Sequence, residues 1–367
     1  MTSPTLVRVH RWVALGLGVV VLLVAGTGAA LVFRDELTAV FTPQIVIAPR
    51  EVPADVYQRV LAAARSVDAE PRTVEIVPAE RPDRAFEVIL KGARPERHLF
   101  VDPHDARIVA DDDRQAMPFV TLFVLHRELF LGPNGEYLAA AGGFALLFLA
   151  ASGIVLWWPR AWKYALRLRL GGGRIAVSYD LHRAIGAVFA IFLLVNAATG
   201  VSMVFDEALP RAVNAVARVE TPPPVPRANP GKMQPLDDIV AAANRALPDG
   251  RVVRVVVREG MPVMVRKRIA GENDTKGMNR INVDGATGAV VAVRALDLQP
   301  PGNRIYEWIY PLHTGKLVGW PYQAVLLLAG LAPLVSLATG LILWRSRAKR
   351  RKPSGAVARA PAPDGVR

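Results

Sequence analysis

Four stretches of this chain carry no charged side chain, and each is long enough to cross a lipid bilayer as a helix. They cover residues 12–33, 137–158, 184–205 and 321–344. A hydrocarbon core takes about 20 helical residues to cross, so the sequence predicts a membrane protein with four transmembrane helices. The first stretch is longer than the apolar part of a cleaved signal and runs into charged residues, so we expect it to be retained.

The positions of lysine and arginine predict the orientation. Residues 1–11, 159–183 and 345–367 hold 16 of them against two aspartates, a net charge of +14, whereas the whole chain has +13. Because basic flanks stay in the cytoplasm, we expect both termini to be cytoplasmic in a bacterial inner membrane. The positive-inside pattern accounts for the basic charge, so we expect no nucleic acid to bind.

The loops between the first and second and between the third and fourth stretches are nearly neutral and are predicted to be periplasmic domains. Each begins with helical apolar spacing and continues as short strands. The helices are expected at 53–65 and 236–246, and the strands at 73–77, 85–90, 98–101, 252–257, 263–268 and 280–283. The predicted order is transmembrane segment 1–33, domain 34–136, helix 137–158, cytoplasmic loop 159–183, helix 184–205, domain 206–320, helix 321–344 and a disordered basic tail 345–367.

The two halves of the chain match in register. The matching residues are His10 with His182, Thr27-Gly28 with Thr199-Gly200, His126 with His313, and Ser152-Gly153 with Thr339-Gly340. Each half has two spans, so the halves point the same way across the membrane. We therefore predict an α-helical membrane fold, a four-helix transmembrane bundle built from two parallel repeats, each with one periplasmic α+β domain.

Four of the six histidines are repeat-equivalent. His10 and His182 lie at the predicted cytoplasmic face, and His126 and His313 lie at the opposite face. A single histidine at a helix end is most simply an interfacial residue, but one pair on each face favours ligation of a planar cofactor with two axial positions. The chain has no cysteine, so any haem is attached non-covalently. These residues predict two b-type haems with bis-histidine ligation.

Other side chains have two interpretations. Arg11, Arg127 and Arg183 directly follow a candidate ligand and would neutralise haem propionates, or they are membrane-end charges. The repeat-equivalent glycines would let a flat ring approach, or they pack helix against helix. Trp157, Trp158 and Trp344 are typical of an aromatic belt, and Asn196 of a hydrogen bond between helices. His98 and His104 are expected at the surface, with a metal or ligand contact as the alternative.

The chain resembles the PepSY-associated transmembrane family. The resemblance is carried by HRW at 10–12, by LHRELFLG at 125–132, by LHTGKLVGW at 312–320 and by the domain endings VDPHDARIV and VDGATGAVV. The family includes ferric-siderophore reductases with two haems. The resemblance implies that His10, His182, His126 and His313 bind haem iron and that the substrate is a ferric siderophore or another ferric chelate. It leaves the catalytic residues unknown.

Two alternatives remain open from the sequence. The chain has no flavin or nicotinamide fingerprint, so a reductase would take electrons from a quinol or from a separate reductase. Membrane lipid is the other expected partner. The main rival is a haem-free membrane sensor or scaffold that binds envelope proteins through its PepSY-like domains. A transporter is disfavoured because the apolar stretches contain no ionisable residue for coupling.

Overall fold

The computed structural model describes residues 4–41, 45–92, 97–112, 118–158, 166–221, 223–272 and 277–350. Four of its helices are long and apolar enough to cross a membrane. They are α1 (Pro4–Leu31), α5 (Pro133–Trp157), α6 (Gly173–Val204) and α10 (Trp320–Arg350). The chain is therefore a membrane protein, as predicted. Residues 351–367, most of the predicted disordered tail, lie outside the described part, and α10 extends past the predicted boundary at 344.

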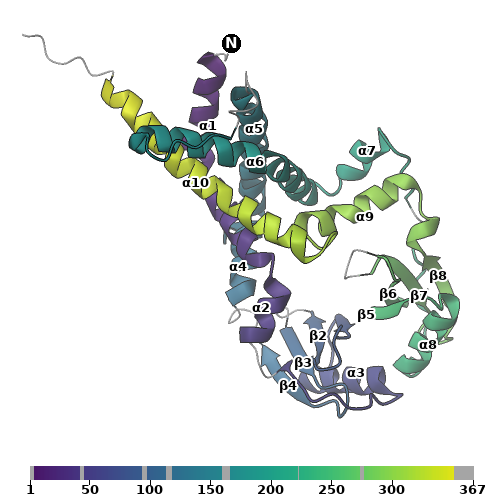
Figure 1. The fold of residues 1–367 in the computed structure, drawn as a ribbon. Coiled ribbons are helices and arrows are strands. Elements are labelled where there is room, and N and C mark those ends of the chain that lie inside the picture. Colours follow the sequence, from purple (N-terminus) through teal and green to yellow (C-terminus); the bar gives the residue numbers. More distant parts are fainter. Residues whose placement is uncertain are drawn as a thin grey trace, which may run out of the picture.

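The four helices form a ring in the order α1–α5–α6–α10. Helix α1 contacts α5 and α10, and α6 contacts the same two, so α1 and α6 lie at opposite corners of the bundle. Figure 1 shows the four helices on the side of the molecule away from the strands. Small residues allow the close crossings. A Cβ atom at Gly143 of α5 would lie 2.6 Å from Val201 Cγ2 of α6, and one at Gly330 of α10 would lie 2.7 Å from Ala29 Cβ of α1. Without hydrophobic driving force in lipid, such close backbone packing holds helices together.

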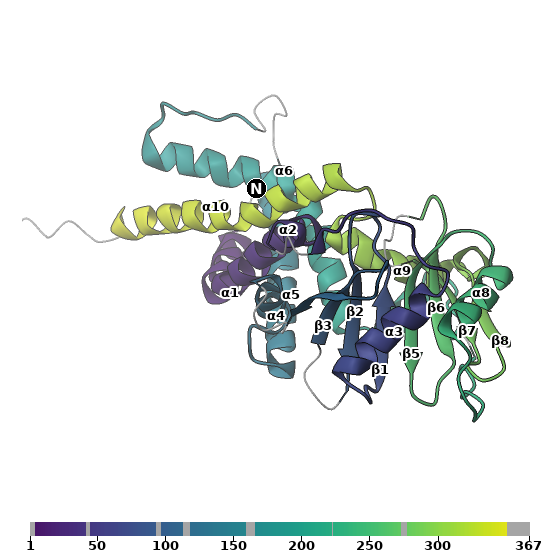
Figure 2. The same cartoon turned by 90° about the horizontal axis from the view of Figure 1, so that it is seen from below.

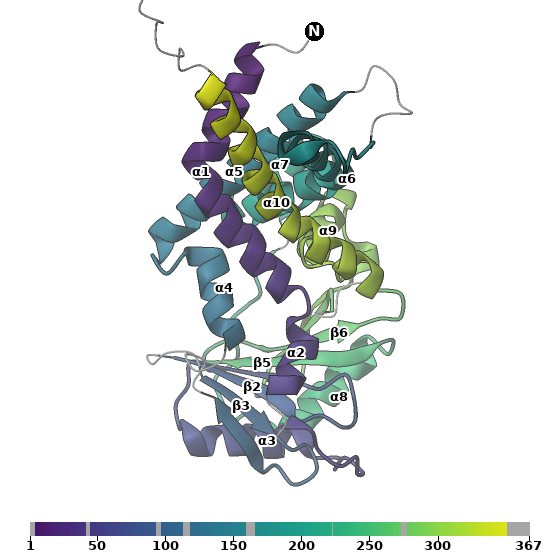
Figure 3. The ribbon, with the colours of Figure 1, turned by 60° about the vertical axis from the view of Figure 1, so that its left-hand side comes forward.

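Short helices connect the bundle to the rest of the chain. They are α2 (Arg34–Phe41), α4 (Pro118–Glu128), α7 (Leu209–Asn214), η4 (Leu296–Leu298) and α9 (Pro301–Thr314). Helices α4 and α9 lie between the bundle and the β-sheet (Figure 3). Each precedes a spanning helix, and each carries one of the candidate histidines near its carboxyl end.

All eight named strands belong to one antiparallel sheet in the order β4-β3-β2-β1-β5-β6-β7-β8. The strands are β1 (Thr73–Val77), β2 (Phe86–Lys91), β3 (Arg97–Val101), β4 (Ile108–Asp112), β5 (Arg251–Arg258), β6 (Val263–Arg268), β7 (Asn279–Val283) and β8 (Val290–Arg294). The first four come from one loop and the last four from the other. The join is β1 with β5, where Glu75 lies opposite Val256. The sequence predicted a small sheet in each loop but not their fusion.

Helices α3 (Val56–Val67) and α8 (Leu236–Ala246) cover one face of this sheet (Figure 2). Their apolar residues share a single core with both sets of strands; Leu61, Ile239 and Val255, for example, are fully buried. Aliphatic burial of this kind contributes about 1.5–3 kcal/mol per side chain. The core therefore holds the two loop domains together.

The amino ends of α3 and α8 cap each other. The Asp237 carboxylate accepts hydrogen bonds from the backbone N–H groups of Tyr57 and Gln58, at 3.0 and 2.9 Å, and Gln58 Oε1 accepts one from Leu236 N at 3.0 Å. A carboxylate at a helix amino end also complements the helix dipole. Burial, with the Asp237 carboxylate nearby, raises the pKa of Tyr57 to about 12.

The opposite face of the sheet carries an ion-paired link between the halves. Glu75 of β1 accepts from Lys91 of β2 at 2.7 Å and also pairs with Arg254 of β5. Burial raises the pKa of Glu75, but the bonds from Lys91 and Arg254 outweigh burial and leave it below the ordinary value. The carboxylate is therefore held in its charged form at the β1–β5 join.

Candidate functional site

The four repeat-equivalent histidines form two pairs, one at each end of the bundle. His10 of α1 and His182 of α6 have ring centroids 6.4 Å apart and are called the distal pair, because they lie at the end of the bundle away from the sheet. His126 of α4 and His313 of α9 have centroids 6.2 Å apart and are called the proximal pair. Each pair takes one ring from each half of the chain.

The spacing of both pairs suits two imidazoles on opposite sides of one metal ion. A metal–imidazole bond of about 2 Å, with about 1 Å more from that nitrogen to the ring centre, puts the two centroids roughly 6 Å apart. The centroid separations of both pairs agree with that value. The angle between the two ring planes is 78° in the distal pair, which is nearly perpendicular, and 48° in the proximal pair.

Each ring rests on a hydroxyl residue and the glycine that follows it. The contacts are His10 on Ser152-Gly153, His182 on Thr339-Gly340, His126 on Thr27-Gly28 and His313 on Thr199-Gly200. The hydroxyl oxygens lie 2.7 to 3.2 Å from Nδ1 of the ring, and all four hydroxyl residues are buried. The ring Cε1 lies closest to the position that a glycine Cβ would take, at 2.8 Å for Gly28 and 3.0 Å for Gly200.

In three of the rings, the contacts at Nδ1 identify the ring nitrogen that carries the proton. His126 Nδ1 is 2.8 Å from the Val24 carbonyl, and His182 Nδ1 is 2.8 Å from the Ser336 carbonyl. A carbonyl only accepts, so Nδ1 must donate its N–H there. His313 Nδ1 has the same kind of partner in the Asn196 carbonyl, at 3.1 Å. Nε2 of these rings is then unprotonated. Among the described residues, the hydrogen-bond partners of the rings all lie at Nδ1 and none lies at Nε2. A bare Nε2 is the form that binds a metal.

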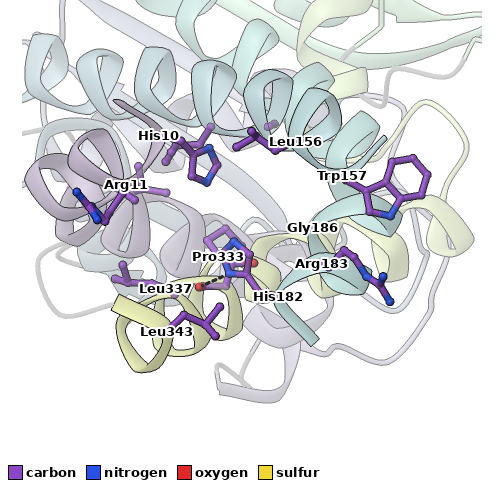
Figure 4. Close-up of a pocket in the computed structure, with 18 of the residues that line it drawn as sticks. His10, Arg11, Leu156, Trp157, His182, Arg183, Gly186, Pro333, Leu337 and Leu343 are labelled. Carbon is purple, nitrogen blue, oxygen red and sulfur yellow. Dashed lines mark hydrogen bonds between the residues drawn. The ribbon is translucent and has the colours of Figure 1, made fainter. Parts of the chain in front are cut away.

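A cavity of about 700 Å³ opens at the distal pair (Figure 4). His10 and His182 stand on opposite sides of it, and Gly153, Gly186 and Gly340 are in its wall. Most of the remaining wall is aliphatic. This volume is within the range of small-molecule and cofactor sites. Trp157, Trp158 and Trp344, interpreted from sequence as an aromatic belt, also line it.

Two of the three predicted arginines lie at this cavity. Arg11 and Arg183 line it, and the Nε atom of each is buried with no hydrogen-bond partner among the described residues. Buried donors are normally paired, so an anionic group in the cavity would satisfy them. The Nη2 atom of Arg183 does have partners, the Arg167 carbonyl at 2.8 Å and the Asp180 carboxylate at 3.7 Å. Arg127 does not line the cavity and pairs with Glu136 at 2.5 Å. The distal site thus offers two imidazoles and two guanidinium groups, a donor set that fits a planar, anionic cofactor such as haem.

The remaining sequence candidates have structural partners. The prediction that His98 is at the surface was wrong, because it is 2% exposed and bonds to Glu87 at 2.5 Å between strands β3 and β2. His104 accepts from Arg50 N and donates to the Glu51 carbonyl. Asn196 donates to the His313 carbonyl at 2.9 Å, which confirms the predicted bond between helices. Within the described ranges no cluster of three or more metal-binding side chains occurs.

The sequence analysis missed the hydroxyl groups that hold the rings. Ser152, Thr27, Thr199 and Thr339 were noted only as repeat matches. The signal was present, because a hydroxyl residue precedes each matching glycine at all four places. Small polar residues in apolar helices are more often interhelical packing, which is why the pattern was not assigned to the histidines.

The chain is similar to a known family along nearly its whole length. The model of the PepSY-associated TM region matches residues 7–347. An uncharacterized protein of Pseudomonas aeruginosa is 26% identical over 254 residues, which cover 63% of this chain and 64% of that relative. The matched part therefore spans less than two thirds of the relative's length.

Proposed function

This chain belongs to the PepSY-associated transmembrane family, and we propose that it is a membrane electron-transfer protein that reduces ferric iron held in a chelate such as a siderophore. It would hold two b-type haems, one at the distal and one at the proximal histidine pair. Electrons would come from a quinol or from a separate reductase, since the sequence has no flavin or nicotinamide motif.

The observation that carries this proposal is the repeated geometry of the pairs. Two imidazoles face each other at 6.4 and 6.2 Å, at both ends of one bundle, with Nδ1 satisfied. Interfacial histidines need neither a partner from the other half nor this common spacing. Bis-histidine ligation accounts for both features at once.

Different residues of this chain would have different roles in binding the haems. The imidazoles would bind the iron and the buried hydroxyl groups orient them, while Arg11 and Arg183 would pair with propionates and the aliphatic wall exclude water. A bound b-type haem supplies reversible one-electron chemistry, tuned by its ligands and their surroundings. Along α1, His10 and the proximal contact at Gly28 are 18 residues apart, which is roughly 27 Å of helix. The pairs are therefore suited to serve opposite faces of a bilayer.

We place the sheet and the proximal pair in the periplasm and both termini in the cytoplasm of a bacterial inner membrane, with the two halves as parallel repeats. The charge distribution supports this orientation. A ferric chelate would then meet the protein on the sheet side. Reduction is the useful step there, because Fe(II) matches hard chelate oxygens less well than Fe(III) and is released.

The direct test is the haem content of the purified full-length protein. A pyridine haemochromogen assay should give close to two non-covalent haems per chain, with low-spin six-coordinate spectra because two imidazoles would ligate each iron. One haem per chain would reject one of the two pairs. Protein without a Soret band, correctly folded, would favour the haem-free sensor or scaffold instead.

A further inference from the structure

The four histidines are not held equally, although their sites are repeat-equivalent. His126, His182 and His313 each have two acceptors at Nδ1, a threonine hydroxyl and a backbone carbonyl. Among the residues that the structure describes, His10 has one, the Ser152 hydroxyl, at 2.7 Å. Within the distal pair, His182 therefore keeps a backbone acceptor if its hydroxyl partner is removed, whereas His10 does not.

The Ser152 hydroxyl is itself fixed in direction. It donates to the Phe148 carbonyl at 2.6 Å, one turn earlier in α5, and Ser152 is 5% exposed. With its hydrogen committed to that carbonyl, the oxygen presents lone pairs to His10 and can only accept there. The proton at His10 consequently resides on Nδ1, which leaves Nε2 bare toward the cavity.

We propose that Ser152 is the positioning residue of the distal site: as the one described acceptor at His10 Nδ1, it sets the tautomer and orientation of His10. This inference rests on the proposed haem ligation. The hydrogen bond from Nδ1 also makes the imidazole a stronger donor, which favours the ferric form of a bound haem. Removing the hydroxyl leaves Nδ1–H without an acceptor in an apolar setting, so the ring is free to turn or to move its proton to Nε2.

The experiment compares Ser152→Ala with Thr339→Ala in the purified full-length protein. Both variants remove a hydroxyl from the same histidine pair, but His182 keeps the Ser336 carbonyl at 2.8 Å when Thr339 is replaced. Ser152→Thr restores an acceptor like those at the other three rings. Ser202→Ala is a matched control, because Ser202 donates to the Thr199 carbonyl in its own helix. The readouts are haem per chain, the midpoint potential of each haem and the low-spin electron paramagnetic resonance signal.

We expect Ser152→Ala to weaken distal haem retention roughly ten-fold or more, or, where haem is retained, to raise the distal potential. A ten-fold change in the ferric-to-ferrous preference corresponds to about 59 mV for a one-electron couple. The low-spin electron paramagnetic resonance signal of the distal haem should change as well, because the angle between the rings of His10 and His182 would no longer be held. Thr339→Ala should move the distal potential clearly less, and Ser152→Thr and Ser202→Ala should leave it close to that of the unmodified protein.

The proximal haem in the same molecules reports whether the variant has folded. If Ser152→Ala does not accumulate, Ser152→Cys, which keeps a weak acceptor of similar size, should give a smaller shift in the same direction. Equal effects of Ser152→Ala and Thr339→Ala, or no effect of Ser152→Ala with both haems present, would overturn this inference while leaving the two-haem proposal intact. Absence of haem from the unmodified protein would instead overturn the proposed function.

Discussion

The distal and proximal pairs have nearly the same ring spacing but are built on different parts of the fold. The distal rings stand on α1 and α6, which are spanning helices. The proximal rings stand on α4 and α9, the short helices between bundle and sheet. Helix α9 is also tied to the sheet, because Glu307 pairs with Arg280 of β7 at 3.0 Å. One site is fixed by the bundle alone, whereas the other depends on both regions.

The glycine contacts differ in the same sense. A Cβ atom at Gly28 or Gly200 would lie 2.8 or 3.0 Å from a proximal ring, whereas one at Gly153 or Gly340 would lie 3.9 or 3.5 Å from a distal ring. The proximal rings are therefore in tight contact with the glycine backbone, and the distal rings have room beside the cavity. The difference teaches that matching sequence positions in two repeats specify a common pairing without specifying a common fit.

The largest expected effect concerns which pair faces which compartment. A reporter enzyme that is active only outside the cytoplasm should work when fused at Pro230, on the sheet side, and fail when fused at Gly172. The physical reason is the positive-inside bias of the loop that contains Gly172. Activity at Gly172 and none at Pro230 would reverse the assignment of proximal and distal faces.

Loss of a ligand should separate the two sites. His313→Ala should remove the proximal haem, spare the distal one and abolish reduction of an external ferric chelate, since the remaining haem is most of a bilayer away. His182→Ala should remove the distal haem, yet the proximal haem of chemically reduced protein should still be oxidised by added chelate. Optical spectra and haem-to-protein ratios measure both results. Equal loss of both haems in either variant would mean that the sites do not assemble independently.

Adding one methyl group at the glycines should affect the proximal site more. Gly28→Ala places a Cβ where His126 Cε1 must move, and we expect a partial loss of proximal haem, roughly ten-fold in retention as for other groups that orient a ligand. Gly153→Ala, at 3.9 Å from His10, is the matched control and should retain the distal haem. Similar losses in the two variants would show that ring-to-glycine distance does not limit either site.

The smallest expected effect is at the ion pair between α9 and the sheet. Glu307 is six residues before His313, about 9 Å along a helix. Glu307→Gln should cost about 1 kcal/mol or less of folding stability, because the pair is partly exposed to water. The lost negative charge should raise the potential of the proximal haem by less than the roughly 59 mV of a ten-fold change and leave the distal potential unchanged. Separate redox titration of the two haems measures this, and a shift confined to the distal haem would contradict the coupling through α9.

Much of the local structure could be predicted from the sequence. Helix α8 and strands β1 and β6 have the predicted bounds, because apolar periodicity specifies element type and buried face. The pairing of β1 with β5 could not be predicted. Period-two alternation shows that a strand is half-buried but not which edge it joins, and the two strands are far apart in the chain.

The site was predicted to a similar degree. Register between the repeats identified His10, His182, His126 and His313 as candidates, and the structure brings them together as the expected pairs. The hydroxyl acceptors, the burial of His98 and the ion pair that occupies Arg127 depend on which side chains meet after folding. The spacing of residues along one sequence does not predict these contacts.

The β1–β5 ladder has a consequence for assembly. The chain passes from one half to the other between the end of α5 at Trp157 and the start of α6 at Gly173, and the sheet links the halves again at the opposite end of the bundle. The two halves therefore cannot separate at the sheet end of the bundle unless the pairing of β1 with β5 is first broken. A large planar group at the proximal pair must therefore enter sideways between helices or before that ladder forms. Because His313 follows β5 in the chain, the proximal pair is complete only after both strands of the ladder have been synthesised, and the time for loading it is before they pair.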